Sequence, residues 1–109
     1  FFNRLKKGVS ENWHPWMEFV RRDPSGHIYG YRTRITVLKI TLNATGEIRK
    51  VGVEQSSGVD FLDQEAVSAF YRAQPFPNPP KGLVTQEGLI TFPFGFHVEF
   101  GEGGLKLPF

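Results

Sequence analysis

Near the end of the chain, apolar and polar positions alternate over residues 88–100, which is the period of a β-strand. One face carries an unbroken apolar series: Ile90, Phe92, Phe94, Phe96, Val98 and Phe100. The other face carries Thr91, Pro93, Gly95, His97 and Glu99. Proline has no N–H for a neighbouring strand and is largely confined to edges and bulges, so Pro93 indicates that one edge of this strand is not fully paired.

Two further strands are predicted upstream, joined by a short turn. Residues 34–42 are rich in β-branched side chains. One face of this segment carries Thr36, Leu38, Ile40 and Leu42. After a turn at residues 43–46, residues 47–55 return with an apolar pattern that slips by one position near Arg49. The pattern predicts a β-hairpin with a bulge in its second strand.

Two segments have the three-and-four spacing of an amphipathic helix. The apolar stripe of the first is Phe2, Leu5, Val9 and Trp13, and Pro15 is expected to end this helix. The second helix is expected from Asp60 to Gln74, with Asp60 as its N-terminal cap. The apolar stripe of the second helix is Leu62, Ala66, Ala69, Phe70 and Ala73. Residues 75–80 are rich in proline, and we interpret them as a rigid connector rather than as a ligand for a polyproline-binding domain.

The order helix, strand, strand, helix, strand predicts an α+β fold. We expect a two-layer sandwich in which two helices cover one face of a small antiparallel sheet of about three strands. A chain of 109 residues is long enough for one domain with one core. We assign the domain to residues 1–100 and a flexible tail to residues 101–109. Residues 17–34 show only a turn at 23–26 and a short aromatic run at 28–31.

Composition narrows the classes of function. The formal net charge of +2 is small and the basic residues are scattered, which argues against a nucleic-acid partner. The absence of cysteine excludes disulfides, thiolate metal sites and a cysteine nucleophile. No stretch approaches the roughly 18 apolar residues of a membrane span. Because the chain opens with Phe1 and not with methionine, we expect it to be part of a longer protein that carries any anchor elsewhere.

Candidate chemical residues do not form a constellation. His14, His27 and His97 lack the spacing of metal ligands, so we expect neither a metal site nor a cofactor. Ser56 and Ser57 do not lie in a nucleophile motif, and a capping role in the turn before the second helix is favoured. Nothing brings an acid, a base and a nucleophile together, and the chain is predicted not to be an enzyme.

Trp13 and Trp16 flank Pro15 at the end of the first helix. They would either form an aromatic platform for a ligand or pack the end of the helix against the sheet. We favour packing, because Trp13 completes the apolar stripe of that helix.

Several motifs spread along the chain occur together in one known family. They are the helix closed by Trp13-x-Pro15, the turn from Asn43 to Gly46, the strand residues Val51 and Val53, Ser56-Ser57-Gly58 followed by Leu62-Asp63 and Ala66, and Pro75-Phe76-Pro77. In this combination they resemble the C-terminal periplasmic domain of the TonB energy-transducer family. The resemblance covers about residues 2–100, and the segment 17–34 is longer than is usual in the family.

The resemblance implies a role in energy transduction across the cell envelope. The full protein would be anchored in the inner membrane, engage a proton-driven motor complex there and present this domain in the periplasm. The domain would bind a short extended segment of an outer-membrane transporter as an added strand and convey force that supports transport. The alternative is a structural or assembly module of another trans-envelope machine, such as a gliding-motility complex, acting through constitutive protein contacts or homodimerisation.

The predicted peptide-binding site is the edge of the last strand over residues 91–99. The N–H and C=O groups of alternate residues point to the same lateral edge of a strand, so Thr91, Gly95, His97 and Glu99 would share the open edge, with Pro93 as its marker. About three or four main-chain hydrogen bonds at about 0.5–1.5 kcal/mol each imply reversible binding, roughly micromolar or weaker.

Overall fold

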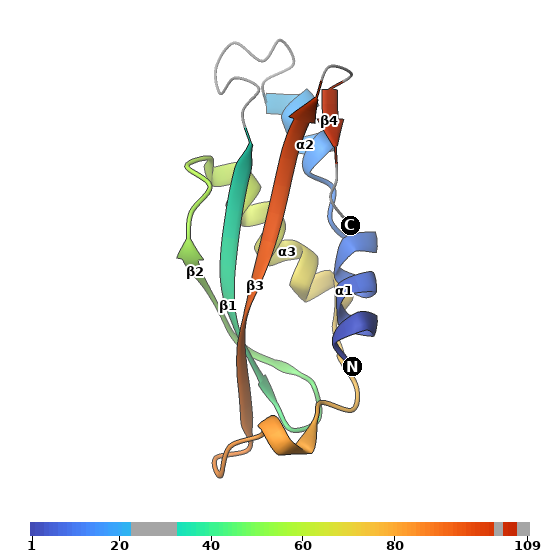
Figure 1. Ribbon diagram of the computed structural model, residues 1–109, viewed down its shortest axis with the longest axis vertical. Helices are drawn as coiled ribbons and strands as arrows, with labels where there is room; N and C mark the ends of the chain where they lie inside the picture. Colours follow the sequence, from blue (N-terminus) through green and yellow to red (C-terminus); the bar gives the residue numbers. More distant parts are fainter. Residues whose placement is uncertain (23–32, 102–103, 107–109) are drawn as a thin grey trace.

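A computed structural model of the chain describes residues 1–22, 33–101 and 104–106 (Figure 1). Its elements are α1 (Phe2–Glu11), α2 (Pro15–Arg22), β1 (Arg34–Asn43), β2 (Ile48–Gln55), α3 (Asp60–Ala73), the 3-10 helix η1 (Lys81–Leu83), β3 (Leu89–Gly101) and β4 (Gly104–Lys106). Long strands form one antiparallel layer, and α1 and α3 form the second layer on one of its faces (Figure 1). The predicted α+β fold class is therefore confirmed.

The sheet has the strand order β2-β1-β3-β4, and each neighbouring pair is antiparallel. β1 lies between the two other long strands and pairs with both. Its register with β2 shifts between Thr41 and Leu42, which face Lys50 and Ile48 and leave Arg49 without a register partner. The bulge predicted near Arg49 is confirmed, and it gives the edge strand β2 a local irregularity.

The core lies between the sheet and the helices and contains most of the predicted stripes, although Phe2 is exposed and Trp13 lies after the end of α1. On the helix side of β1 the buried residues are Thr36, Leu38, Ile40 and Leu42. The helices contribute Leu5, Val9, Leu62, Ala66, Ala69 and Phe70. The Phe70 ring lies with its centroid 5.0 Å from that of Phe94 and 6.0 Å from that of Phe96. Burial of each such aromatic side chain is worth about 1.5–3 kcal/mol, so these rings hold α3 firmly on the sheet.

The helix α2 was not predicted. Pro15, expected only as a stop, is the first residue of α2. Proline fits this position because the first N–H of a helix has no intrahelical acceptor. Phe19 anchors α2 by packing edge-on against Phe61 of α3, with ring centroids 5.3 Å apart. The predicted turn at 23–26 and the aromatic run at 28–31 lie outside the described residues.

The start of α3 differs from the prediction. Asp60 was expected to be the N-cap, but Val59 takes that position and no side chain caps the helix. Asp60 and Asp63 instead lie in the first turn, where the positive end of the helix dipole favours carboxylates. At the carboxyl end, α3 stops at Ala73, close to the expected boundary.

The connector after α3 is locked to the hairpin turn between β1 and β2. The N–H of Phe76 donates to the carbonyl oxygen of Gly46 at 3.0 Å, and the Phe76 side chain is buried in the core. Gly46 has φ +91°, and a Cβ on it would lie 1.8 Å from the Phe76 carbonyl oxygen. These contacts support the interpretation of residues 75–80 as a connector, and they explain why the turn requires glycine.

Part of the predicted tail forms a short strand. Gly104–Lys106 forms β4, which pairs with Glu99–Gly101 of β3. The flexibility assigned to residues 101–109 stays a prediction.

Candidate functional site

The candidate site is the lateral edge of β3 that faces away from β1. β3 pairs with β1 from Leu89 to Val98, and with β4 only from Glu99 to Gly101. Within the described residues, the outer edge from Leu89 to Val98 has no strand partner. We call this stretch the open edge. Such an edge presents a row of unpaired N–H and C=O groups, which is a template for an added strand.

The two faces of β3 have opposite character along the open edge. The core side carries Ile90, Phe96 and Val98, which are buried, and Phe92 and Phe94, which are partly buried. The other side carries exposed Thr91, Pro93, Gly95 and His97. Four of the five predicted site positions therefore lie together along the open edge, on the face away from the helices.

Glu99 lies just beyond the open edge. Its register partner is Lys106 of β4, so its main chain already belongs to a strand pair. A strand added along β3 would therefore have to stop at Val98 or displace β4 to reach Glu99.

Two of the predicted residues have neighbours on the exposed face. The Oγ1 atom of Thr91 lies 3.2 Å from Oγ1 of Thr41 on β1, so these hydroxyls hydrogen-bond across the strands. A Cβ placed on Gly95 would lie 3.9 Å from Nε2 of His97. The imidazole of His97 therefore stands beside Gly95, where it would be adjacent to a strand bound there.

Aromatic contacts hold β3 against the helix layer. Phe96 packs edge-on against Trp13, with ring centroids 5.0 Å apart, and Phe94 packs in the same way against Phe70. Each such pair contributes about 0.5–1.5 kcal/mol beyond its burial. Trp13 is buried, as the packing interpretation predicted, whereas Trp16 is 49% exposed. The two tryptophans thus have different environments and do not form a shared platform.

The Ser-Ser-Gly signature and Asp63 form a hydrogen-bonded network at the start of α3. The Asp63 carboxylate accepts hydrogen bonds from Ser56 Oγ, from the N–H and Oγ of Ser57 at 3.0 and 2.8 Å, and from Thr36 Oγ1 of β1 at 2.9 Å. The Ser57 hydroxyl also accepts from the N–H of Val59 at 3.1 Å. The serines thus organise the turn that leads into α3 and join it to the sheet.

The charge of Asp63 is stabilised by these donors. Burial raises the pKa of the Asp63 carboxyl, but the hydrogen bonds from Ser56, Ser57 and Thr36 outweigh burial and hold the pKa below its ordinary value of 3.8. Asp63 is therefore a structural carboxylate, ionised near neutral pH.

A second buried carboxylate joins α3 to the segment between α1 and α2. Glu65 Oε2 lies 2.6 Å from a guanidinium nitrogen of Arg72 and accepts the His14 N–H at 2.7 Å. Arg72 also donates to the Asn12 carbonyl at 2.8 Å. This arrangement fixes the end of α1, and with it Trp13, under β3.

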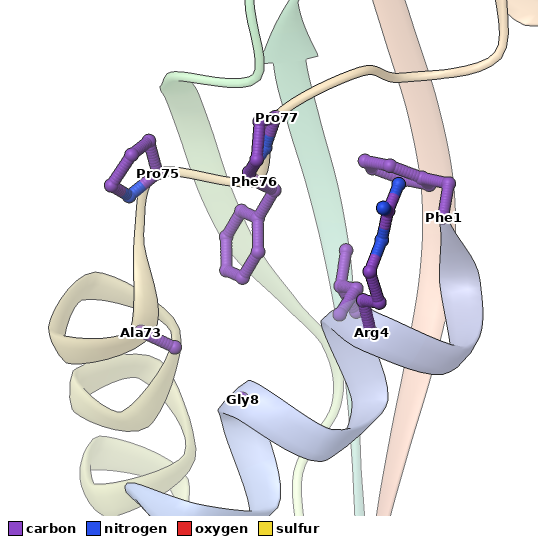
Figure 2. Close-up of a pocket in the computed structure, with 8 residues that line it drawn as sticks. Phe1, Arg4, Gly8, Ala73, Pro75, Phe76 and Pro77 are labelled. Carbon is purple, nitrogen blue, oxygen red and sulfur yellow. The ribbon is translucent and has the colours of Figure 1, made fainter.

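A small apolar cavity lies between α1 and the connector after α3 (Figure 2). Its volume is about 120 Å³, and Phe1 and Arg4 border it on one side while Pro75 and Pro77 border it on the other. Its described lining offers Arg4 as the one charged side chain. The cavity is far smaller than the roughly 300 Å³ at which ligand pockets begin, so we do not assign it as the site.

Two further properties concern metal binding and membrane spanning by the described residues. They contain no group of three or more His, Cys, Asp or Glu side chains that could hold a metal ion. None of their helices has both the length and the apolar character for crossing a bilayer. His27 lies outside the described residues.

Comparison with known proteins identifies relatives of the chain. A family model for the TonB C terminal matches residues 1–94. The solution structure of the Helicobacter pylori TonB C-terminal domain is similar, with a TM-score of 0.64 and 21% identity over 94% of this chain and 82% of that one. The structure of the HasB C-terminal domain has a TM-score of 0.50 and 20% identity over 94% and 70% of the two chains. No curated protein matches the sequence.

Proposed function

This chain belongs to the TonB C-terminal family, and from that premise we propose that it is a non-catalytic periplasmic domain of an energy transducer anchored in the inner membrane. In this proposal, it binds an extended peptide of an outer-membrane partner by strand addition at the open edge. It then conveys force from a proton-driven motor, which another part of the protein engages, and so supports transport. The observation that carries the proposal is the unpaired outer edge of β3 from Leu89 to Val98.

The length of the open edge sets the strength of binding. A peptide along this edge would make about three or four main-chain hydrogen bonds, each worth about 0.5–1.5 kcal/mol, against the entropy of ordering the peptide. The balance corresponds to roughly micromolar affinity or weaker. A transmitter that releases its partner after each cycle requires such reversible binding.

The proposed binding residues follow from the position of β4. Gly95 and His97 lie in the second half of the open edge, just before the part of β3 that β4 pairs, and contribute main-chain groups, with the His97 imidazole beside Gly95 for limited side-chain selectivity. Thr91 extends the edge towards the start of β3. Glu99 would take part only if the peptide displaces β4.

The anchoring of β3 supports a role in force transmission. β3 is paired with β1 along the full open edge, and its core-facing rings are packed on Trp13 and Phe70. A load applied to a peptide on β3 would therefore pass into the central strand, α3 and the segment that follows α1.

Amide chemical-shift mapping tests the proposed site. The labelled protein would be titrated with synthetic peptides copied from the periplasmic segments of outer-membrane transporters of the same organism. We expect the largest shifts at Gly95, His97 and their neighbours on β3, and smaller shifts elsewhere. Shifts confined to β2 or to the helices, with Gly95 to Val98 silent, would contradict the site.

The same open edge also suits an assembly role, in which two copies pair edge to edge. The unpaired stretch of β3 favours this second function because antiparallel pairing of identical edges is self-complementary. Light scattering across a range of concentrations separates the two. A stable dimer whose amides at Gly95 and His97 are protected from exchange would favour assembly, whereas a monomer at all concentrations would favour peptide binding.

A further inference from the structure

The sheet face opposite the helices carries three cations close to one another. Lys39 of β1 and Arg49 and Lys50 of β2 are exposed and line one broad depression of about 880 Å³. Its remaining described lining is Thr41, Gly52, Val53, Glu54, Leu89 and Thr91. Within the described residues, none of the three cations forms an ion pair. We call Lys39, Arg49, Lys50 and Gly52 the basic sheet face.

Gly52 provides an independent observation at the centre of this face. It lies directly opposite Lys39 in the β1–β2 register, and its backbone is not left-handed. A Cβ on Gly52 would meet no atom within 4 Å. Neither conformation nor crowding therefore requires glycine, although glycine weakens a strand. Glycine in a strand often marks a bulge or a close approach by a ligand or another backbone, and Gly52 itself lies in regular register between the two register shifts of β2, at Arg49 and Glu54.

Lys39 has a small residue as its register partner on each neighbouring strand. Its partner on β2 is Gly52, which has no side chain, and its partner on β3 is Pro93, whose ring is short and rigid. The ammonium group of Lys39 can therefore be reached across the sheet from either neighbour.

We propose that the basic sheet face is a docking surface for an acidic, extended segment of a protein partner, separate from the open edge of β3. Carboxylates of the segment would pair with Lys39, Arg49 and Lys50, and its main chain would cross the sheet over Gly52. The inference goes beyond the proposed function, because strand addition uses the edge of the sheet and not its face.

The mixed lining favours a peptide over a uniform polyanion. Leu89 and Val53 offer apolar contact to the aliphatic parts of the side chains that face the sheet, and Thr41 and Thr91 line the same depression. Glu54 lines the same depression and would repel a ligand that is negative at every position. Exposed ion pairs are weak and screened by salt, so binding should be weak and should decline as ionic strength rises.

The test uses a short peptide with glutamate at every second position and threonine between, and the same peptide with glutamine in place of glutamate. Titration into the labelled 109-residue protein at low ionic strength should shift the amides of Lys39, Lys50 and Gly52. The glutamine peptide should leave these amides unchanged. Glutamate-dependent shifts elsewhere, or none, would overturn the proposal.

Two variants locate the interaction. Lys39→Gln with Arg49→Gln and Lys50→Gln should weaken binding about tenfold, while removal of the same charge at Arg4, Lys7 and Lys81 should leave the affinity within about twofold.

Gly52→Val keeps every cation but places a side chain over the backbone that the segment would cross. It should weaken binding severalfold without lowering the melting temperature, because valine favours strands. Unchanged affinity in either variant of the basic sheet face would overturn the proposal.

A polyphosphate competitor distinguishes a peptide surface from a general anion site. Polyphosphate should displace the glutamate peptide poorly at equal charge concentration, and equal displacement would overturn the peptide assignment. Shifts at Gly95 and His97 with transporter peptides report on the open edge separately, so either proposal can fail while the other stands.

Discussion

At the residue scale, Pro93 shows how one missing donor can mark an edge. It lies opposite Lys39, and the β1–β3 register continues without interruption on both sides of it. The β1–β3 pairing tolerates proline if the Pro93 nitrogen points to the open edge, because no acceptor on β1 then requires an N–H from residue 93. Proline at that place also limits unwanted pairing between edges.

Pro93→Val is predicted to restore a donor on the open edge. One further main-chain hydrogen bond is worth about 0.5–1.5 kcal/mol, so we expect peptide affinity to rise about twofold to tenfold. Isothermal titration measures the affinity, and chemical denaturation measures the free energy of unfolding. Greater stability with unchanged affinity would show that residue 93 faces β1, and would remove Pro93 as the marker of the open edge.

Asp63 is predicted to be a structural residue. Asp63→Asn removes the negative charge that four hydrogen-bond donors stabilise. The NH2 group of asparagine would also face hydroxyl groups that now donate to the carboxylate. We therefore expect the free energy of unfolding to fall by about 2–3 kcal/mol. Asp60→Asn is the matched control, because Asp60 is exposed in the same turn and should cost less than about 0.5 kcal/mol. Equal losses in the two variants would contradict the role of the network.

The same carboxylate predicts a dependence of stability on pH. The folded-state pKa of Asp63 is below the value of 3.8 expected when unfolded, so its ionised form stabilises the fold fully above that value. This contribution is lost as the pH falls through the folded-state pKa. In acid denaturation, the difference between the protein and Asp63→Asn should shrink below about pH 4. A difference that is constant between neutral and acidic pH would contradict the assignment.

At the element scale, the hairpin turn and the connector act as one unit through Gly46. Gly46→Ala puts a Cβ 1.8 Å from the Phe76 carbonyl oxygen at φ +91°, and we expect a loss of at least about 2–4 kcal/mol. Gly88→Ala is the control, because φ there is +77° but no atom lies within 4 Å of the added Cβ. It should cost only about 1–2 kcal/mol of backbone strain. If thermal or chemical unfolding shows the same loss of stability for both variants, the backbone at Phe76 can move to accept the added Cβ.

The elements were predictable where one local pattern determines them. The stripe over 60–73, the β-branched run of β1 and the slip at Arg49 each specify their element without reference to the rest of the chain. The helix α2 was missed because proline ends a helix but also begins one, and only tertiary packing of Phe19 on Phe61 resolves the ambiguity.

The candidate site was predictable in part for a similar reason. Alternation along β3 places Gly95 and His97 on the exposed face, and Pro93 signals an edge. Glu99 pairs with Lys106 of β4, in a glycine-rich part of the sequence that has no periodic pattern to predict a strand. The network of Asp63 includes Thr36, which lies 27 positions away on β1, and no local spacing relates the two.

At the scale of the whole molecule, the proposed function requires the bound peptide to detach before the domain unfolds. The peptide would be held by about three or four main-chain hydrogen bonds. β3 itself is held by pairing with β1 from Leu89 to Val98 and by aromatic contacts to Trp13 and Phe70. The weakest junction along the load path should therefore be the one between peptide and open edge.

A cross-link between β1 and β3 tests this order of rupture. Thr41 and Thr91 are register partners with hydroxyls 3.2 Å apart, and the chain has no cysteine, so Thr41→Cys with Thr91→Cys should form a single disulfide. Under load between a tethered peptide and the start of α1, the oxidised and reduced forms should separate at the same force, because the peptide leaves first. A higher rupture force after oxidation would show that β3 peels from β1 before the peptide detaches. The domain would then extend under load instead of passing the force on, and strand addition at β3 would not serve transmission.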